Sequence, residues 1–240
     1  WTSRLPKAIT TKAHPIVLTT VLILSIFQLT GFVIGSSFTD VLKSYKFGSL
    51  NFMQAGAGDF LLYMLGPAVV SFSMSMYSQK KLLKDNLFVV LVAVLISSAG
   101  SLFGTAAFVR LIKLGGDGDN FLRRSVLARN VTAALAMVIT EILDGNVAIG
   151  ASVVVLTGIA AATYGRSILD AMGLKDPVSR GLGMGAGGQS LGAASLAGEA
   201  EAFPFAAVAF VFNAILATSL ITIPAFKAAL LNVMGSGAVP

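Results

Sequence analysis

One arginine stands where it could bind an organic anion. Arg129 directly precedes a short uncharged segment, 130–140, whose first residues include Asn130 and Thr132. A helix N-terminus attracts anions through its unpaired N–H groups and its dipole, and a guanidinium adds a fork that matches a carboxylate. We therefore predict that Arg129 holds a carboxylate at the start of a helix. The alternative is an interfacial arginine that reaches lipid phosphates.

A second segment, 181–198, is rich in glycine, with seven glycines in eighteen residues. Glycine costs about 1 kcal/mol relative to alanine in a helix interior, so we expect an interruption near Gln189. The sequence Ala193–Ala197 resembles Thr132–Ala136, sixty-one residues earlier, and paired interrupted segments are typical of a transporter's central site. We predict that Gln189 and Arg129 face one pocket. Helix packing through small residues is the alternative.

Three carboxylates could carry a coupling proton or ion. Glu199 and Glu201 follow the glycine-rich segment, and Asp59 precedes an apolar window. A carboxylate at membrane depth is costly and usually functional as a relay, and we favour Glu201 because it lies closest to the last apolar window. The alternatives are ordinary loop charges for the two glutamates and a helix N-cap for Asp59.

Asp59 also ends a Gly-x-Gly-Asp sequence, Gly56–Asp59, which is the signature of an intramembrane aspartyl protease. That chemistry needs two aspartates that share a proton. The only upstream aspartate is Asp40, which stands in Phe-Thr-Asp instead of the Tyr-Asp that the signature requires. The protease is therefore a remote alternative.

The chain lacks the residues that several other kinds of chemistry need. The chain has no cysteine and one histidine, His14, so it offers neither the ligands of a zinc site nor the base of a serine protease. We expect no enzyme activity, and no metal or organic cofactor is implied. The net charge of +6 is scattered between apolar stretches, which favours membrane lipid over nucleic acid as the partner of the basic residues.

The composition places these residues in a membrane. Of 240 residues, 55% are hydrophobic and 12% are charged, whereas a soluble domain has roughly 25% charged residues. Uncharged windows are apolar on every face, unlike the strands of a membrane barrel, and each could cross about 30 Å of hydrocarbon as a helix. They run over 13–39, 60–79, 86–109, 145–165 and 202–226.

We therefore predict an all-α integral membrane protein with about seven transmembrane spans. Two of its elements, 124–143 and 178–198, are expected to be discontinuous helices that face each other near the midplane of an inverted-repeat bundle. In this interpretation residues 1–240 form a single transport domain.

Several stretches resemble the LrgB/CidB family, and they resemble its plastid branch more than its bacterial one. They occur in family order over nearly the whole chain. The stretches are AGAGDFLLYMLGPAVVSFSMSMYSQKKLLK (55–84), SLFGTAAFVRL (101–111), RNVTAALA (129–136), VVVLTGIAAATYG (153–165), LKDPVSRGLG (174–183) and GEAEAFPF (198–205).

The resemblance implies a secondary transporter of glycolate and glycerate in the plastid inner envelope, as used in photorespiration, that works by uniport, exchange or proton symport. These substrates are small 2-hydroxy monocarboxylates. Their hydroxyl would be bound by Asn130, Thr132, Gln189 and Ser190. The bacterial branch implies instead a holin-like or autolysis-regulating protein of a bacterial inner membrane.

Plastid members also carry an N-terminal half of the LrgA type, which is absent from this chain. We therefore expect a fragment or a stand-alone subunit that pairs with an LrgA-like half or with copies of itself. The loss of a family histidine argues against a proton-carrying role at that position, because an amide does not titrate. The departures from the family pattern are Ala128 for Pro, Gln189 for His, Ser190 for Gly, Ala193 for Thr and Ala200 for Pro.

Overall fold

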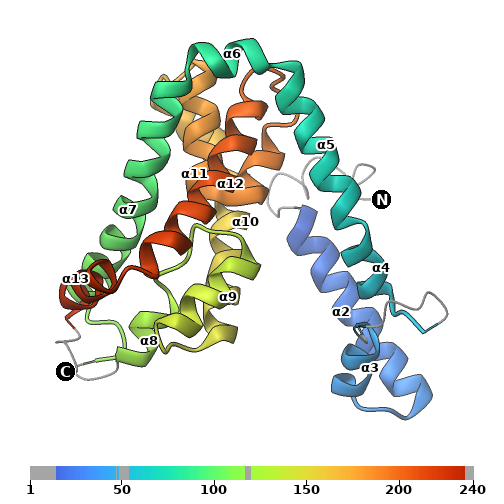
Figure 1. Ribbon diagram of the computed structural model, residues 1–240. Helices are drawn as coiled ribbons and strands as arrows, with labels where there is room; N and C mark the ends of the chain where they lie inside the picture. Colours follow the sequence, from blue (N-terminus) through green and yellow to red (C-terminus); the bar gives the residue numbers. More distant parts are fainter. Residues whose placement is uncertain (1–14, 47, 49–53, 117–119, 236–240) are drawn as a thin grey trace. The chain divides into compact units, whose positions relative to one another are not determined.

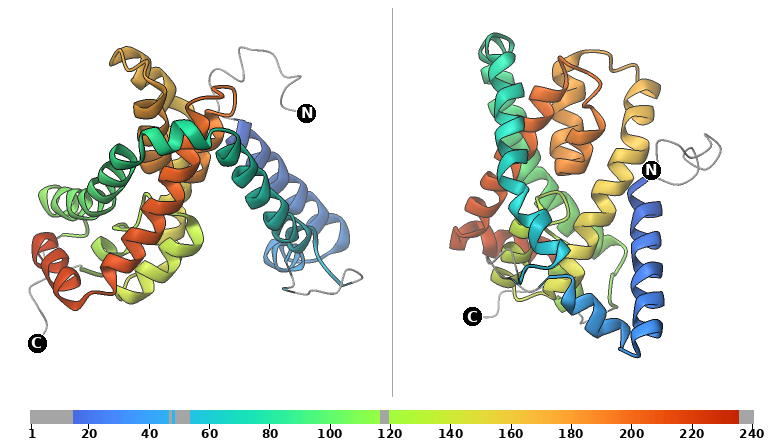
Figure 2. Two further views of the ribbon diagram at one scale, coloured as in Figure 1. Left: turned by 45° about the horizontal axis from the view of Figure 1, so that its top comes forward. Right: turned by 90° about the vertical axis from the view of Figure 1, so that its right-hand side faces the viewer.

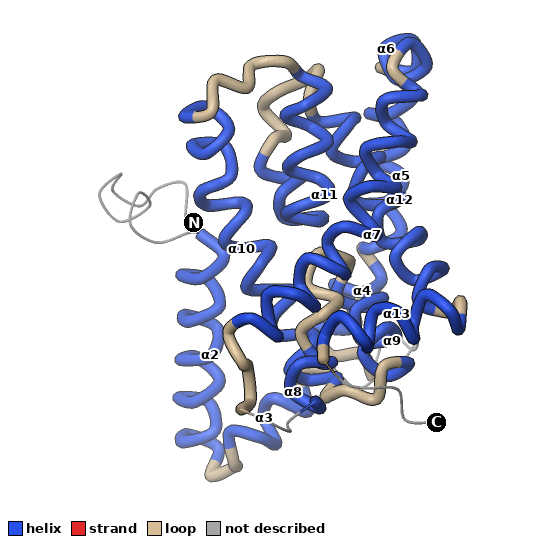
Figure 3. The backbone as a smooth tube through the Cα atoms, turned by 90° about the vertical axis from the view of Figure 1, so that its left-hand side faces the viewer, coloured by secondary structure: helices blue, strands red, loops and turns tan. Residues whose placement is uncertain are grey.

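A computed structural model describes residues 15–46, 48, 54–116 and 120–235 (Figure 1). Those residues form helices joined by loops, without a strand among them (Figure 3). His14 and the start of the first predicted window lie outside the described residues. The helices are α2 (Pro15–Ile34), α3 (Phe38–Ser44), α4 (Ala57–Tyr63), α5 (Leu65–Ser78), α6 (Lys80–Asp85), α7 (Leu87–Leu111), α8 (Asn120–Ser125), α9 (Ala133–Ile142), α10 (Val147–Ala171), α11 (Pro177–Ser195), α12 (Phe203–Ile221) and α13 (Pro224–Met234).

The chain divides into two compact units, Trp1–Met74 and Ser75–Pro240. In the first unit α2 ends before Gly35, whose φ of 71° is left-handed and therefore suits glycine. Ser37 then caps α3 by accepting a hydrogen bond from the Thr39 N–H. The two helices meet at a bend of 112° (Figure 2). The single transport domain over 1–240 stays a prediction.

Among the described residues, three helices are long and apolar enough to cross a membrane: α7, α10 and α12. They confirm the predicted windows 86–109 and 145–165 and most of 202–226. The bent pair α2–α3 makes a fourth span if it crosses as one element.

The other expected spans are interrupted. The window 60–79 is divided at Met64 into α4 and α5, and each is too short to cross about 30 Å of hydrocarbon alone. α11 has 19 residues but too many glycines for a strongly apolar span. The described residues thus contain three or four candidate membrane spans. The seven spans and the inverted repeat stay predictions.

α12 is the central helix of the second unit (Figure 1). Of its apolar window 61% is buried, against 22% for α7 and 17% for α10. α7 and α10 instead expose large apolar side chains such as Phe88, Ile96 and Leu156. Exposed apolar side chains in these numbers suit a lipid environment, so α7 and α10 form the outer wall of this unit.

Glycines allow α11 to pack closely against its neighbours. A Cβ at Gly185 would collide with the backbone of Ala206 on α12, and a Cβ at Gly188 would collide with Ala161 on α10. The alternative of small-residue helix packing is therefore correct for this segment. It does not compete with an interrupted helix, because both occur in α11.

Both predicted discontinuous elements are interrupted. Between α8 and α9, residues 126–132 lie outside regular helix (Figure 3). Within α11, Gln189 alone departs from helical geometry, with φ 49° and ψ −146°, a strained conformation for a residue other than glycine. The Asn130 amide donates to the carbonyl oxygen of Ala186 at 3.3 Å. The two interrupted elements therefore face each other.

Gly185→Ala should destabilise the protein, because the added Cβ meets the carbonyl oxygen and Cα of Ala206 and a helix backbone cannot move aside like a side chain. We expect a loss of about 1–3 kcal/mol, measured as a lower melting temperature in detergent. Gly183→Ala is the matched control, since its nearest neighbour is Leu169 Cδ2 at 3.7 Å. Equal melting of the two variants would contradict the proposed α11–α12 contact.

Candidate functional site

Arg129 lies in the irregular segment before α9 and lines a cavity of about 430 Å³. Its Nε donates to the Thr105 hydroxyl oxygen at 3.0 Å. Apart from these two residues the wall is glycine or hydrophobic, which is typical of a small-molecule pocket with few polar groups. The lining residues are Gly104, Thr105, Phe108, Val109, Ile112, Leu114, Val126, Arg129 and Val153.

Arg129 is half-buried, and within the described part of the chain no carboxylate forms an ion pair with it. With Nε engaged by Thr105, the two terminal nitrogens remain to bind a ligand. A guanidinium in an apolar cavity favours an anion that forms two parallel hydrogen bonds with it. The cavity is therefore suited to a small carboxylate.

Asn130 points away from this cavity into a buried polar network. Its own carbonyl oxygen accepts from Asn213 Nδ2 at 3.1 Å, and Ser98 Oγ donates to Asn213 Oδ1 at 3.0 Å. Asn130 is 2% exposed, and its Oδ1 has no hydrogen-bond partner among the described residues. A buried acceptor without a donor costs about 1–3 kcal/mol, so this oxygen is a candidate for a ligand hydroxyl.

The remaining predicted ligand-binding residues lie at the helix interruptions. Gln189 is buried, and its Nε2 donates to the Val154 carbonyl oxygen on α10 at 2.6 Å. Ser190 follows it and is half-buried, and Thr132 is the N-cap of α9 without a side-chain capping bond. Gln189 is not among the residues that line the Arg129 cavity, and a pocket shared by the two residues stays a prediction. The two side chains point to different helices, α10 and α7.

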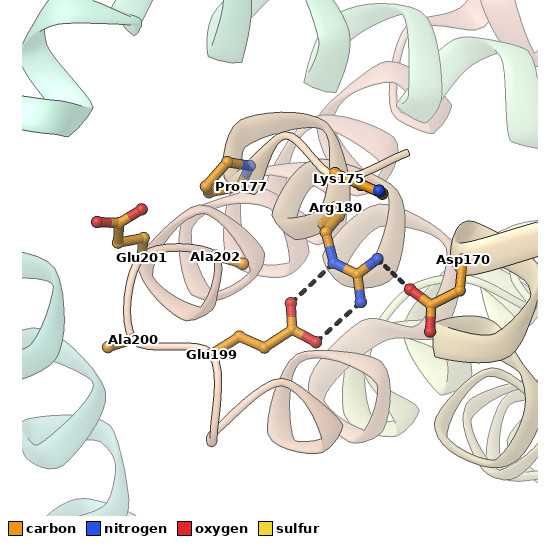
Figure 4. A pocket seen from close by; sticks show the side chains of 8 residues that line it. All are labelled: Asp170, Lys175, Pro177, Arg180, Glu199, Ala200, Glu201 and Ala202. Carbon is orange, nitrogen blue, oxygen red and sulfur yellow. Dashed lines mark hydrogen bonds and ion pairs between the residues drawn. The ribbon is translucent and has the colours of Figure 1, made fainter. Parts of the chain in front are cut away.

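A cluster of charges joins the end of α10, the first half of α11 and the α11–α12 loop (Figure 4). Arg180 donates to both carboxylate oxygens of Glu199, at 2.8 and 2.9 Å, and to Asp170 Oδ1 at 2.6 Å. Arg166 approaches the same glutamate, with Nε 3.2 Å from Oε1. Arg180 is thus neutralised by two acids, and it connects three elements.

These bonds hold the pKa of Glu199 below its usual range. The main cause is the hydrogen bond from Arg180, and burial acts in the opposite direction. A glutamate with a lowered pKa remains ionised near neutral pH. Its position therefore suits a structural ion pair better than a proton relay.

The other two predicted relay carboxylates have different surroundings. Glu201 is exposed and lines a cavity of about 420 Å³ beside the charge cluster. Asp59 is buried in the first turn of α4 and accepts hydrogen bonds from the Gly56 and Gly48 N–H groups, at 3.0 and 2.9 Å. Asp59 thus stabilises the helix start from its third position, as the acid of a capping box does. The aspartyl protease gains no support from this arrangement.

Sequence reasoning missed Thr105, Asp170 and Arg180. Arg180 could have been noticed, because it is the only charge within an otherwise apolar, glycine-rich helix. Thr105 gave no signal in the sequence, since it lies 24 residues from Arg129 on a separate helix.

Comparison with known proteins gives consistent results. The LrgB-like family matches residues 2–226. The chain is 35% identical over 237 residues to the plastidal glycolate/glycerate translocator 1, chloroplastic, of Arabidopsis thaliana, covering 97% of this chain and 45% of that protein. It is 27% identical over 150 residues to the antiholin-like protein LrgB of Bacillus cereus (strain B4264), covering 62% of this chain and 64% of that protein. The same values hold for the antiholin-like protein LrgB of Bacillus anthracis (strain CDC 684 / NRRL 3495).

The chain therefore spans less than two thirds of the length of these relatives. No solved structure matches it.

Glu199→Gln removes the charge that binds Arg180, and its effect should depend on pH. Because the pKa of Glu199 is lowered, the ion pair stabilises the fold above the unfolded-state pKa of about 4.3, and this stabilisation is lost as pH falls through the folded-state pKa. The variant should melt below wild type at pH 7, and the gap should close as the pH falls through the folded-state pKa.

Glu201→Gln is the control for this experiment, since its side chain makes no ion pair or hydrogen bond in the described part of the chain. It should melt like wild type over the same pH range. A gap for Glu199→Gln that persists unchanged into acid would show that the ion pair is not its cause.

Proposed function

Because the chain belongs to the LrgB-like family, we propose that it is a secondary transporter of small 2-hydroxy monocarboxylates, glycolate and glycerate, in the plastid inner envelope. The relative from Arabidopsis thaliana is named for these two substrates. The observation that carries the proposal is the Arg129 cavity, in which one guanidinium meets an apolar wall.

In this proposal, the cavity binds the carboxylate of such a substrate and the polar network binds its hydroxyl. Arg129 takes the carboxylate through its terminal nitrogens. The buried acceptor Asn130 Oδ1 lies outside this cavity, so in this proposal it binds the substrate hydroxyl at another point of the path. Thr132, Gln189 and Ser190 lie at the same two interruptions and line the path of the substrate in this proposal.

The architecture supports transport in the same way. The bent pair α2–α3, the pair α4–α5, the interrupted α8–α9 and α11, and the three long helices together make the seven spans that we propose, with α9 and α11 as the related halves of an inverted repeat. Discontinuous helices around a central site are typical of secondary transporters. An LrgA-like half or a further copy of this chain is the partner that we propose for this domain.

Transport of glycolate into liposomes tests the function directly. We expect the reconstituted chain to take up radiolabelled glycolate, Arg129→Ala to abolish uptake, and Arg129→Lys to raise the apparent KM about 10- to 100-fold, because an ammonium lacks the fork geometry. Uptake in Arg129→Ala at the wild-type KM would remove Arg129 from the site. A pore-regulating protein, as the antiholin-like name suggests for the Bacillus relatives, would instead change leakage of an unrelated dye.

Asn130→Ala should reduce selectivity for the hydroxyl. Acetate differs from glycolate only by lacking this group, and a site that binds a hydroxyl rejects the analogue without it. We expect wild type to prefer glycolate over acetate in competition assays and the ratio of inhibition constants to fall about tenfold in the variant. A merely destabilised protein would lose activity with the ratio unchanged, and that result would refute the assignment.

Proton coupling belongs to Glu201 in this proposal, since Glu199 is held in its ion pair and Asp59 stabilises the start of α4. Glu201→Gln should flatten the pH dependence of uptake and leave counterflow exchange intact. An unchanged pH profile would leave exchange or uniport as the mode of transport.

A further inference from the structure

We propose that Thr105 on α7 is the second residue of the carboxylate site, where it orients Arg129 and donates its own hydroxyl proton to the substrate. This inference rests on the proposed function, since it adds a residue to the Arg129 cavity. Thr105 was not among the residues singled out in the sequence.

The first observation is the direction of the hydrogen bond. Arg129 Nε donates and Thr105 Oγ1 accepts, at 3.0 Å. A guanidinium has five N–H donors in a fixed plane, so a bond at Nε sets the rotation of the whole group. The terminal nitrogen on the same side of the plane as Nε–H then points an N–H group past the Thr105 hydroxyl, so that a carboxylate oxygen placed there can accept from both residues.

The second observation is that the Thr105 hydroxyl has a proton left to donate. Threonines in a helix often donate to the carbonyl four residues earlier, as Thr163 does to Ile159 at 2.7 Å. In the described part of the chain the Thr105 hydroxyl has no acceptor of this kind, and its hydrogen bond is the one that it accepts from Arg129. Thr105 is 5% exposed and lines the cavity.

These two bonds make one binding unit. A carboxylate in the cavity receives an N–H bond from the terminal nitrogen of Arg129 beside Nε and an O–H bond from Thr105, and the remaining wall is apolar. Hydrogen bonds to a charged group in such surroundings are shorter and stronger than neutral ones. Loss of the Thr105 hydroxyl therefore weakens substrate binding twice, by removing one donor and by releasing the guanidinium.

The test compares Thr105→Val with Thr105→Ser in liposomes that contain the 240-residue chain. Valine keeps the volume and lacks the hydroxyl, so we expect the apparent KM for glycolate to rise about tenfold or more, with a smaller change in maximal rate. Serine restores the hydroxyl and should restore the KM to within about threefold of wild type. If serine and valine give the same KM, or valine matches wild type, the inference is wrong.

Two further variants separate this inference from its premise. Thr163→Val makes the same chemical change on α10, where the hydroxyl bonds only its own helix, and should leave the KM unchanged. Thr105→Val combined with Arg129→Lys should cost less than the product of the single effects, because both residues form one unit. If Arg129→Ala transports normally, the proposed function fails; if only the Thr105 variants are normal, the inference alone fails.

If the valine variant does not fold, Thr105→Ala replaces it in the KM measurement. It removes the same hydroxyl with less bulk and should show the same rise in KM, and a wild-type KM in this variant would overturn the inference.

Discussion

The structure depends on how an interrupted backbone finds hydrogen-bond partners inside an apolar bundle. An unsatisfied N–H or carbonyl group costs several kcal/mol in such surroundings. Here the side chains of neighbouring elements supply the partners: Asn213 donates to the Asn130 carbonyl, and Asn130 donates to the Ala186 carbonyl. Two asparagines therefore connect α12, the segment before α9 and α11, and they fix the place where both helices can be interrupted.

Close packing determines where in α11 the interruption stands. The helix is held on two sides, by α12 through Gly185 and by α10 through Gly188. A positive φ at Gln189 costs of order 1–3 kcal/mol, and the bond from its side chain to Val154 offsets part of this cost. Gly158 leaves room for that side chain, since a Cβ there would lie 3.3 Å from Gln189 Nε2.

Hydropathy and glycine content were sufficient to predict the long helices and the two interruptions, because these properties depend on local sequence. The partners of Arg129 and Arg180 depend on how separate helices are rotated, which one sequence does not encode locally. Thus Thr105 was missed. In an irregular segment neighbouring side chains also point to different elements, so that Arg129 reaches α7 while Asn130 reaches α11.

Three arginines of the second unit show why the Arg129 cavity is suited to an anion. Arg180 is neutralised by Glu199 and Asp170. Arg123 is buried against backbone carbonyls of Leu114 and Gly116, at 2.8 and 2.7 Å, so its donors satisfy the loop after α7. Arg129 contacts a neutral hydroxyl instead, and its charge is uncompensated by any ion pair among the described residues. One carboxylate neutralises that charge, whereas a second carboxylate on the same substrate would be buried without a partner. In the proposed function, this charge balance favours a monocarboxylate over a dicarboxylate as the substrate.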